Sequence, residues 1–266
     1  MSAPGSWSLP SLIEAVSPVL PGFTAEVLPE VDSTNSELMR RARAGDTRPT
    51  LLVAERQTAG RGRRGREWHS APGDSLTFSL GLPLAPASWS GLSLAVGVAV
   101  ARALHPDIGL KWPNDLWLQG RKLAGILVET ASVVDRPGAD PGPDRSPVRY
   151  AVVGVGINIA PRPPGEALAT PSAALRELWP QAEAAAVLAR IAPPLAEALR
   201  VFDRQGFAPF EDAFRAHDLL QGRTVTLSDG TFGTARGVDG SGALLVHTAA
   251  GLQTVSSAEV SVRPSS

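Results

Sequence analysis

The sequence contains no cysteine, which excludes disulfide bonds, thiolate metal sites and a thiol nucleophile. It lacks an apolar run of membrane-spanning length, and no basic segment followed by an apolar core marks a signal peptide at the N-terminus. The net charge is −1 over 266 residues, so the basic excess that a general nucleic-acid binder spreads over one face is missing. These absences predict a cytoplasmic protein with neither DNA nor a membrane as its partner, and the length allows one large domain plus a small one.

What is present is a segment rich in glycine and arginine, 57–68, directly after the apolar run Leu51–Ala54. Glycine lets a backbone come close to a ligand, and arginine adds planar cationic groups that pair with phosphate or carboxylate oxygens. The pattern predicts a loop that closes over an anionic small molecule. A solvated basic loop, or an arginine–glycine segment that binds nucleic acid, explains the same residues, so this segment alone does not decide between them.

A polar cluster stands at the start of a predicted helix. Asp32 and Ser33 are natural N-caps for a helix that runs to about Ala44, and a cap contributes about 1 kcal/mol without any ligand. The hydroxyls of Ser33 and Thr34, with the N–H groups of the helix start, would also suit a polar ligand. Taken by itself, the cluster favours the cap.

Lysine, amide and carboxylate side chains gather further along the chain. Lys111, Asn114 and Asp115 follow a predicted strand, a combination that suits phosphate with Mg²⁺, although a plain turn after proline explains Asn-Asp equally. Lys122 begins the next strand, where burial is costly unless the amine meets an anion or its head reaches solvent. Gly125 in that strand allows close backbone approach.

Hydrophobic patterns and turn residues predict an α+β chain. The predicted strands are Leu51–Ala54, Ser75–Leu82, Ile108–Trp112, Arg121–Glu129 and Tyr150–Ile159, and the predicted helices lie at Leu9–Val16, at Ser88–Leu104 with Ser88 as cap, and through most of Ala167–His217. Pro193-Pro194 should kink or split the last helical stretch, and 136–147 is expected to be a mobile surface loop. Short strands between glycine turns from Arg223 to Val262 predict a small β-barrel of about five strands.

Five stretches, in this order, resemble the motifs of the biotin–protein ligases: Ser33-Thr34-Asn35, Gln57 through Trp68, Lys111–Leu116, Lys122–Glu129 and Gly154–Asn158. The resemblance implies a mixed β-sheet with helices, similar to class II aminoacyl-tRNA synthetase cores, followed by an SH3-like barrel. With it, the chain divides into an N-terminal extension 1–25, a catalytic domain 26–218 and a barrel 219–266. Regulatory members carry an N-terminal winged helix for which residues 1–30 leave no room, so DNA repression is not expected.

The same resemblance implies a two-step reaction and a set of residues for it. ATP and Mg²⁺ would convert biotin to biotinyl-5′-adenylate, and a lysine of a biotin carboxyl carrier domain would then attack it. Biotin would be bound by Ser33, Thr34, Asn35, Gln57, Gly60, Arg61, Gly62, Arg63, Lys122 and Gly125; the nucleotide by Arg63, Arg66, Trp68, Lys111, Asn114, Asp115 and Asn158; and catalysis would rest on Lys122, Arg63, Lys111 and Asp115. Asp115 would also bind the metal.

Two alternatives remain at this stage. A lipoate- or octanoate-transferring relative would use a related core, although such octanoyl transferases need a cysteine, and lipoate ligases do not share the glycine–arginine segment. A nucleic-acid-binding protein would use that segment with the terminal barrel. The sequence does not distinguish a monomer from a homodimer, and it names neither the acceptor protein nor the base that deprotonates the acceptor lysine. No role follows for 136–147 or for Pro193-Pro194.

Overall fold

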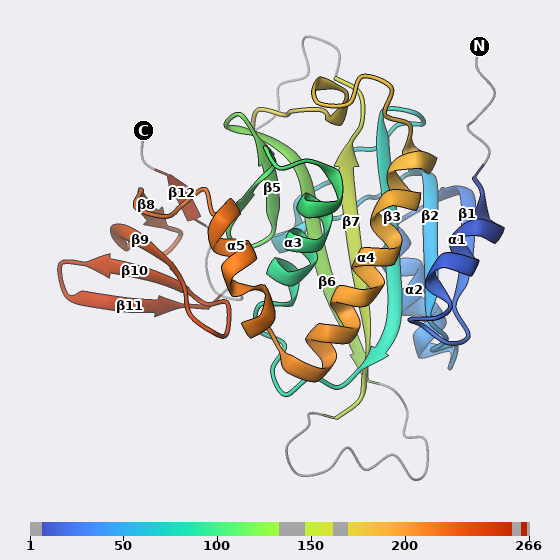
Figure 1. Ribbon diagram of the computed structural model, residues 1–266, viewed down its shortest axis with the longest axis horizontal. Coiled ribbons are helices and arrows are strands. Elements are labelled where there is room, and N and C mark those ends of the chain that lie inside the picture. The colour runs from blue at the N-terminus through green and yellow to red at the C-terminus, as the bar shows by residue number, and fades with distance from the viewer. Residues whose placement is uncertain (1–6, 133–146, 162–169, 257–261, 265–266) are drawn as a thin grey trace.

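The computed structural model describes residues 7–132, 147–161, 170–256 and 262–264. A seven-stranded mixed sheet forms the centre, and a smaller five-stranded antiparallel sheet lies beside it, as Figure 1 shows. The predicted class, a mixed sheet with helices followed by a small β domain, is confirmed; among the described residues of that domain, which was predicted as an SH3-like barrel, no strand pairing closes the sheet into a barrel. The expected mobile loop 136–147 lies outside the described residues apart from its last residue.

The central sheet has the strand order β1-β2-β3-β7-β6-β5-β4. Its strands are β1 (Thr24–Val31), β2 (Thr50–Gln57), β3 (Ser75–Leu84), β4 (Gly109–Lys111), β5 (Asp115–Leu118), β6 (Arg121–Ser132) and β7 (Arg149–Asn158). Among the strand pairs that the structure describes in this sheet, β1–β2 alone is parallel. A hairpin turn joins β5 to β6, with positive φ at Gln119 and Gly120. Strand β1 was not predicted, because it has no fully buried residue and no alternating pattern.

The two faces of this sheet differ sharply in side-chain size. On β3, Leu76, Phe78 and Leu80 point into the main hydrophobic core, whereas Thr77 and Ser79 point to the opposite face because side chains alternate along a strand. Their partners on β7 are glycines: Thr77 pairs with Gly156 and Ser79 with Gly154. One face is therefore packed and apolar, and the other has a floor of small residues with room above it.

Helices cover both faces, as Figure 1 shows. Helices α3 (Leu92–Leu104) and α4 (Ala184–Gln205) pack against each other and on the apolar face. Helix α2 (Thr34–Arg43) lies on the opposite face, where Leu38 and Met39 pack on Leu52 and Val152 of the sheet. The short helices α1 (Leu9–Val16) and α5 (Glu211–His217) complete the set, and α1 matches its predicted bounds.

Two helix predictions need correction. Helix α3 begins at Leu92 with Gly91 in the cap position, and Ser88 lies outside it, accepting a hydrogen bond from the Ser90 N–H within a turn. Helix α4 is not split at Pro193-Pro194 but runs through both prolines for 22 residues. We attribute this continuity to its long apolar face, which is buried on both sides of the prolines and offsets the backbone hydrogen bonds that proline cannot make.

The small sheet has the order β11-β10-β9-β8-β12. Its strands are β8 (Thr224–Leu227), β9 (Phe232–Val238), β10 (Leu244–Thr248), β11 (Gly251–Val255) and β12 (Val262–Pro264), so the five predicted strands are present, and β11 and β12 lie at its two edges. The indole N–H of Trp112, just after β4, donates to the carbonyl of Gly242 in the β9–β10 turn at 3.1 Å. This bond ties the small sheet to the end of β4.

Asp218 lies where the chain passes from α5 toward the small sheet. One carboxylate oxygen accepts the Leu220 N–H at 2.8 Å; the other is buried and has no hydrogen-bond partner among the described residues. Burial raises the pKa of this carboxyl above its usual value, because desolvation disfavours the charged form.

We therefore expect Asp218→Asn to increase stability at neutral pH by about 1 kcal/mol. The pKa of Asp218 is higher in the folded protein than in the unfolded chain, so the charged carboxylate opposes folding at pH 7. As the pH falls below the folded-state pKa, the carboxylate is protonated in the folded protein and this penalty decreases. It is gone once the pH lies below the ordinary pKa of an aspartic acid. Urea unfolding at pH 7 and pH 4 checks the prediction, with Asp212→Asn as the control because Asp212 is fully exposed. A gain of equal size at both pH values would contradict it.

Candidate active site

A cavity of about 890 Å³ opens above the small-residue floor of the central sheet. Nearly all of the residues predicted for the site line it: Ser33, Thr34, Asn35, Gln57, Arg61, Gly62, Arg63, Arg66, Trp68, Lys111, Asn114, Asp115, Lys122, Gly125 and Asn158. Gly60 is the one predicted residue that does not line the cavity. The fold thus brings five separate stretches of the chain to one place.

One wall of the cavity is the start of helix α2. Ser33 caps the helix, accepting the Ser36 N–H, so the structural explanation offered by the sequence is right. The Gln57 side-chain oxygen accepts both the backbone N–H of Thr34 at 2.8 Å and its hydroxyl at 3.1 Å. The hydroxyl of Ser79, from the floor, lies 2.7 Å from the Thr34 hydroxyl. This wall is neutral, hydrogen-bonded and fixed in place, and it suits a neutral polar ligand group.

Asn35 has a structural task that its motif did not reveal. Its amide nitrogen donates to the carbonyl of Leu127 at 3.2 Å and to the carboxylate of Glu129 at 2.9 Å. Its oxygen lies 2.6 Å from the hydroxyl of Ser79. A Cβ on Gly154 would come within 2.2 Å of that oxygen, so the glycine makes room for Asn35. Asn35 therefore fastens α2 to the sheet beneath the cavity.

The glycine–arginine segment, which we call the arginine loop (58–68), covers the cavity. Arg61 and Glu67 form an isolated β-bridge, and the Trp68 N–H donates to the Gly60 carbonyl at 2.9 Å. A Cβ on Gly60 would lie 2.2 Å from the Trp68 carbonyl oxygen, so this close return of the chain requires glycine. Gly60 thus acts by closing the base of the loop rather than by lining the cavity.

Trp68 rests on the floor of the cavity. A Cβ on Gly156 would lie 2.4 Å from its indole ring, and a Cβ on Gly125, which pairs with Gly156 across the sheet, would lie 3.6 Å from the same ring. The indole N–H is buried and has no hydrogen-bond partner within the described part of the chain. Gly125 and Gly156 therefore provide a flat surface for an aromatic ring, in agreement with the close approach expected at Gly125.

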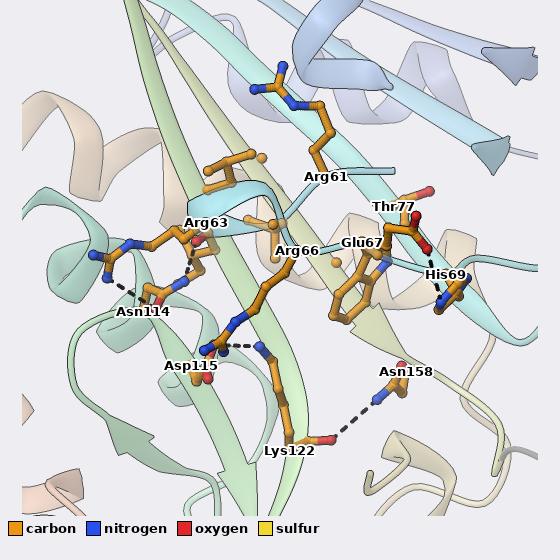
Figure 2. Close-up of a pocket in the computed structure, with 18 of the residues that line it drawn as sticks. Arg61, Arg63, Arg66, Glu67, His69, Thr77, Asn114, Asp115, Lys122 and Asn158 are labelled. Carbon is orange, nitrogen blue, oxygen red and sulfur yellow. Dashed lines mark hydrogen bonds and ion pairs between the residues drawn. The ribbon is translucent and has the colours of Figure 1, made fainter. Parts of the chain in front are cut away.

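Cations gather at the other end of the cavity, around Asp115. Lys122 Nζ lies 2.7 Å from a carboxylate oxygen of Asp115, and Figure 2 shows Arg66 pointing toward this pair. Arg63 Nη1 lies 3.5 Å from the side-chain oxygen of Asn114. Burial lowers the pKa of Arg63, although Asp115 opposes that shift. Cations outnumber the carboxylate here, so this end of the cavity is suited to an anion.

Asparagine side chains hold the backbone of this cationic end. The Asn158 amide donates to the carbonyls of Lys122 and Ala173, at 3.3 and 3.1 Å, and the Asn114 amide donates to the carbonyl of Ile126 at 2.8 Å. Lys111 lies over the ring of Trp117, 4.2 Å from its centroid. The amide N–H groups of both asparagines thus serve to position β6.

The sequence matches the Biotin/lipoate A/B protein ligase family over residues 27–136 and the Biotin protein ligase C terminal domain over residues 222–263. It is 35% identical to the bifunctional ligase/repressor BirA of Escherichia coli (strain K12), over 98% of this chain and 83% of that protein. The chain belongs to the biotin protein ligase family.

Other biotin protein ligases agree with this assignment. A biotin–[acetyl-CoA-carboxylase] ligase of Paracoccus denitrificans is 34% identical, over 88% of this chain and 98% of its own length. The fold superposes on the biotin protein ligase from Aquifex aeolicus in complex with biotin and ATP with a TM-score of 0.74 and 30% identity, covering 91% of this chain and 99% of that one.

Sequence reasoning missed several residues that build this ligase site. Thr77 on the floor, Ser79 buried beneath Thr34 and Asn35, Trp117 under Lys111, and Glu129 beside Asn35 were not proposed. The alternation of small polar and large apolar residues along 75–82 is the signal that would have found the floor. The two lysines that were predicted have a further property: they are the only lysines among the 25 Lys and Arg residues of the sequence, and both line the cavity.

Proposed function

We propose that this protein joins biotin to ATP, forming biotinyl-5′-adenylate and pyrophosphate, and then transfers the biotinyl group to a lysine of a biotin carboxyl carrier protein. The observation that carries the proposal is the polarity of the cavity. A neutral hydrogen-bonding wall at Thr34 and Gln57 lies at one end of the cavity. A cationic cluster that includes Arg63 and Lys122 lies at the other end. Biotin has the matching polarity, with a neutral ureido ring at one end and a carboxylate at the other.

In the first step a carboxylate oxygen of biotin attacks the α-phosphorus of ATP, and pyrophosphate leaves. Negative charge builds up on the α-phosphate oxygens as the bond forms. Lys122, which pairs with Asp115 in the cavity, would meet that charge by leaving this ion pair. Arg63 would bind the same anion from the loop side. Catalysis then consists of positioning and charge stabilisation, and no enzyme nucleophile is required.

In the second step the acceptor lysine amine attacks the acyl carbon of the mixed anhydride, and AMP leaves. Ser33, Thr34 and Gln57 would hold the ureido ring through both steps. Trp68 would stack against the nucleotide base, and Lys111 and Arg66 would bind its phosphates. Because the amide N–H groups of Asn114 and Asn158 already bond to backbone carbonyls, we propose that these two residues support the nucleotide site mainly by holding β6.

Asp115 is the residue that would hold Mg²⁺. Among the described residues no group of three or more His, Asp or Glu side chains forms a metal cluster. This fits Mg²⁺ bound by ATP, because Mg²⁺ commonly takes one or two protein carboxylates and completes its shell with phosphate oxygens and water. Asp115 would have to exchange its ion pair with Lys122 for the ion. The bound ion would neutralise charge on the phosphates.

The rival functions fit the site less well. A lipoate or octanoate ligase needs an apolar acyl channel, whereas the wall at Thr34 and Gln57 is fixed by hydrogen bonds. The arginine loop that a nucleic-acid binder would present is folded over the cavity, with Arg63 half-buried. Among the described residues no helix is long and apolar enough to span a membrane. Three statements stay predictions: the protein is cytoplasmic, it does not bind DNA, and it is a monomer or a homodimer.

Mass spectrometry under native conditions tests the proposal. Protein incubated with ATP, Mg²⁺ and biotin should carry a bound species with the mass of biotinyl-adenylate, with release of pyrophosphate. Lipoate in place of biotin should give neither. Adenylation of lipoate at a rate equal to that of biotin, or no adenylate with either acid, would overturn the proposal.

We predict that Arg63→Gly still forms the adenylate but releases it early. The side chain is half-buried beside Asn114, and loss of a charge-assisted hydrogen bond weakens binding by about 1.5–3 kcal/mol, or tenfold and more. Biotinylation of an unrelated bystander protein should therefore rise about tenfold. Arg48→Gly is the matched control, since Arg48 is exposed and pairs with Asp46 away from the cavity. Bystander labelling at the wild-type level, with ATP still consumed, would show that Arg63 does not retain the intermediate.

A further inference from the structure

Glu129 joins two parts of the site that are far apart in the sequence. It lies on β6, on the face that carries Gly125 and Leu127. One carboxylate oxygen accepts the amide of Asn35 at 2.9 Å, and the other lies 3.3 Å from the guanidinium of Arg61. The carboxylate therefore touches the start of helix α2 and the arginine loop at the same time.

Arg61 is turned away from the cationic cluster that its neighbour Arg63 joins. Figure 2 shows Arg61 pointing away from Asp115 and Lys122, toward which Arg66 points. Its second guanidinium nitrogen lies 3.4 Å from the hydroxyl of Ser36, in the first turn of α2. The N-terminus of a helix is positive, so it repels a nearby cation such as Arg61. The ion pair with Glu129 compensates for this repulsion and keeps Arg61 beside the first turn of α2.

We infer that Glu129 is a positioning residue whose ion pair with Arg61 latches the arginine loop over the cavity. The inference rests on the proposed function only for its catalytic consequence, because the latch itself is a contact within the chain. Through Asn35 the same carboxylate also fastens the helix start that bears Ser33 and Thr34. Loop closure and the ureido-facing wall would then depend on one side chain. In this assignment Arg61 contributes to binding through the latch rather than by contacting biotin.

Limited proteolysis tests the latch without any substrate. Trypsin cuts after arginine in backbone that opens locally, and the loop offers Arg61, Arg63, Arg64 and Arg66. We expect Glu129→Gln and Arg61→Met to raise the rate of cleavage after Arg64 about fivefold, the size expected for a half-exposed ion pair. Glu30→Gln is the matched control, since Glu30 pairs with Arg56 outside the cavity and should leave the rate unchanged.

The catalytic consequence is measured as the dissociation rate of biotinyl-adenylate. Each single variant should release it about fivefold faster, and the double variant no faster than either one, because both substitutions remove the same contact. A merely structural role would instead lower the melting temperature; we expect a change within about 2 °C for Glu129→Gln, because its amide oxygen can still accept from Asn35.

The outcomes of these experiments distinguish a failure of the latch from a failure of the proposed function. Unchanged cleavage in both single variants, or a multiplicative effect of about 25-fold on release in the double variant, overturns the latch whatever the substrate is. Faster cleavage in both variants, with no adenylate formed by the wild-type protein, supports the latch and overturns the proposed function instead.

Discussion

Lys122→Ala should reduce biotin-dependent pyrophosphate release at least about 100-fold while leaving the protein folded. Its amine pairs with Asp115 at 2.7 Å at the cationic end of the cavity, and its backbone is held by Pro171, Ala173 and Asn158. A donor fixed in advance at the position of developing charge typically contributes about 3 kcal/mol to the transition state, which corresponds to roughly 100-fold or more in rate.

The adjacent residue provides the control for this experiment. Arg121 pairs with Glu177 at 2.6 Å and does not line the cavity, so Arg121→Ala removes a neighbouring charge from the same strand without touching the site. Its rate should stay within about twofold of wild type, as expected for a surface ion pair. Near-normal pyrophosphate release by folded Lys122→Ala would remove Lys122 from the mechanism.

Gly154→Ala should lower the melting temperature by about 6–12 °C. The added Cβ would lie 2.2 Å from the side-chain oxygen of Asn35, a separation at which one of the two groups must move. Asn35 is buried and bonded to Ser79, Leu127 and Glu129, so it cannot yield without losing these bonds. Overpacking typically costs 1–3 kcal/mol and each lost hydrogen bond about 1 kcal/mol; a total of about 3 kcal/mol corresponds to this shift.

Thermal unfolding followed by circular dichroism measures that effect. Gly240→Ala is the matched control, because no atom lies within 4 Å of a Cβ at that position and its φ is not in the left-handed region. The control should melt within about 2 °C of wild type. Equal melting temperatures for the two variants would show that α2 is not fastened through Asn35.

The site residues were accessible from the sequence because their motifs are short and local. Ser33 begins a helix, Lys122 begins a strand, and glycine and arginine alternate in one loop, so each pattern carries its own chemistry. The sequence did not show which of these residues face the ligand and which hold the backbone in place. Whether an asparagine faces a ligand or a backbone carbonyl depends on what the fold brings beside it, and the partners of Asn35 lie more than 40 residues away.

The prediction of the fold was likewise partly correct, and its errors also arose where tertiary contacts decide the structure. Strands with buried apolar runs, such as β3 and β7, were found, whereas β1 has a charged, half-buried sequence and is defined by its pairing with β2. Local rules also misplaced the start of α3 and predicted a kink or split in α4, of which the split is absent because tertiary packing dominates over the preference of proline.

The confinement of both lysines to the cavity has a chemical consequence for the outer surface. Arginine stays protonated and does not attack acyl donors, so Lys111, Lys122 and the α-amino group are the only amines that an acylating reagent can find on this chain. An enzyme that makes an activated acyl group therefore offers that group almost no acceptor on itself. Acetic anhydride would add at most three acetyl groups at nitrogen, and a ligand in the cavity would shield two of those positions. The acetyl count of the intact protein would thus report directly whether the cavity is filled.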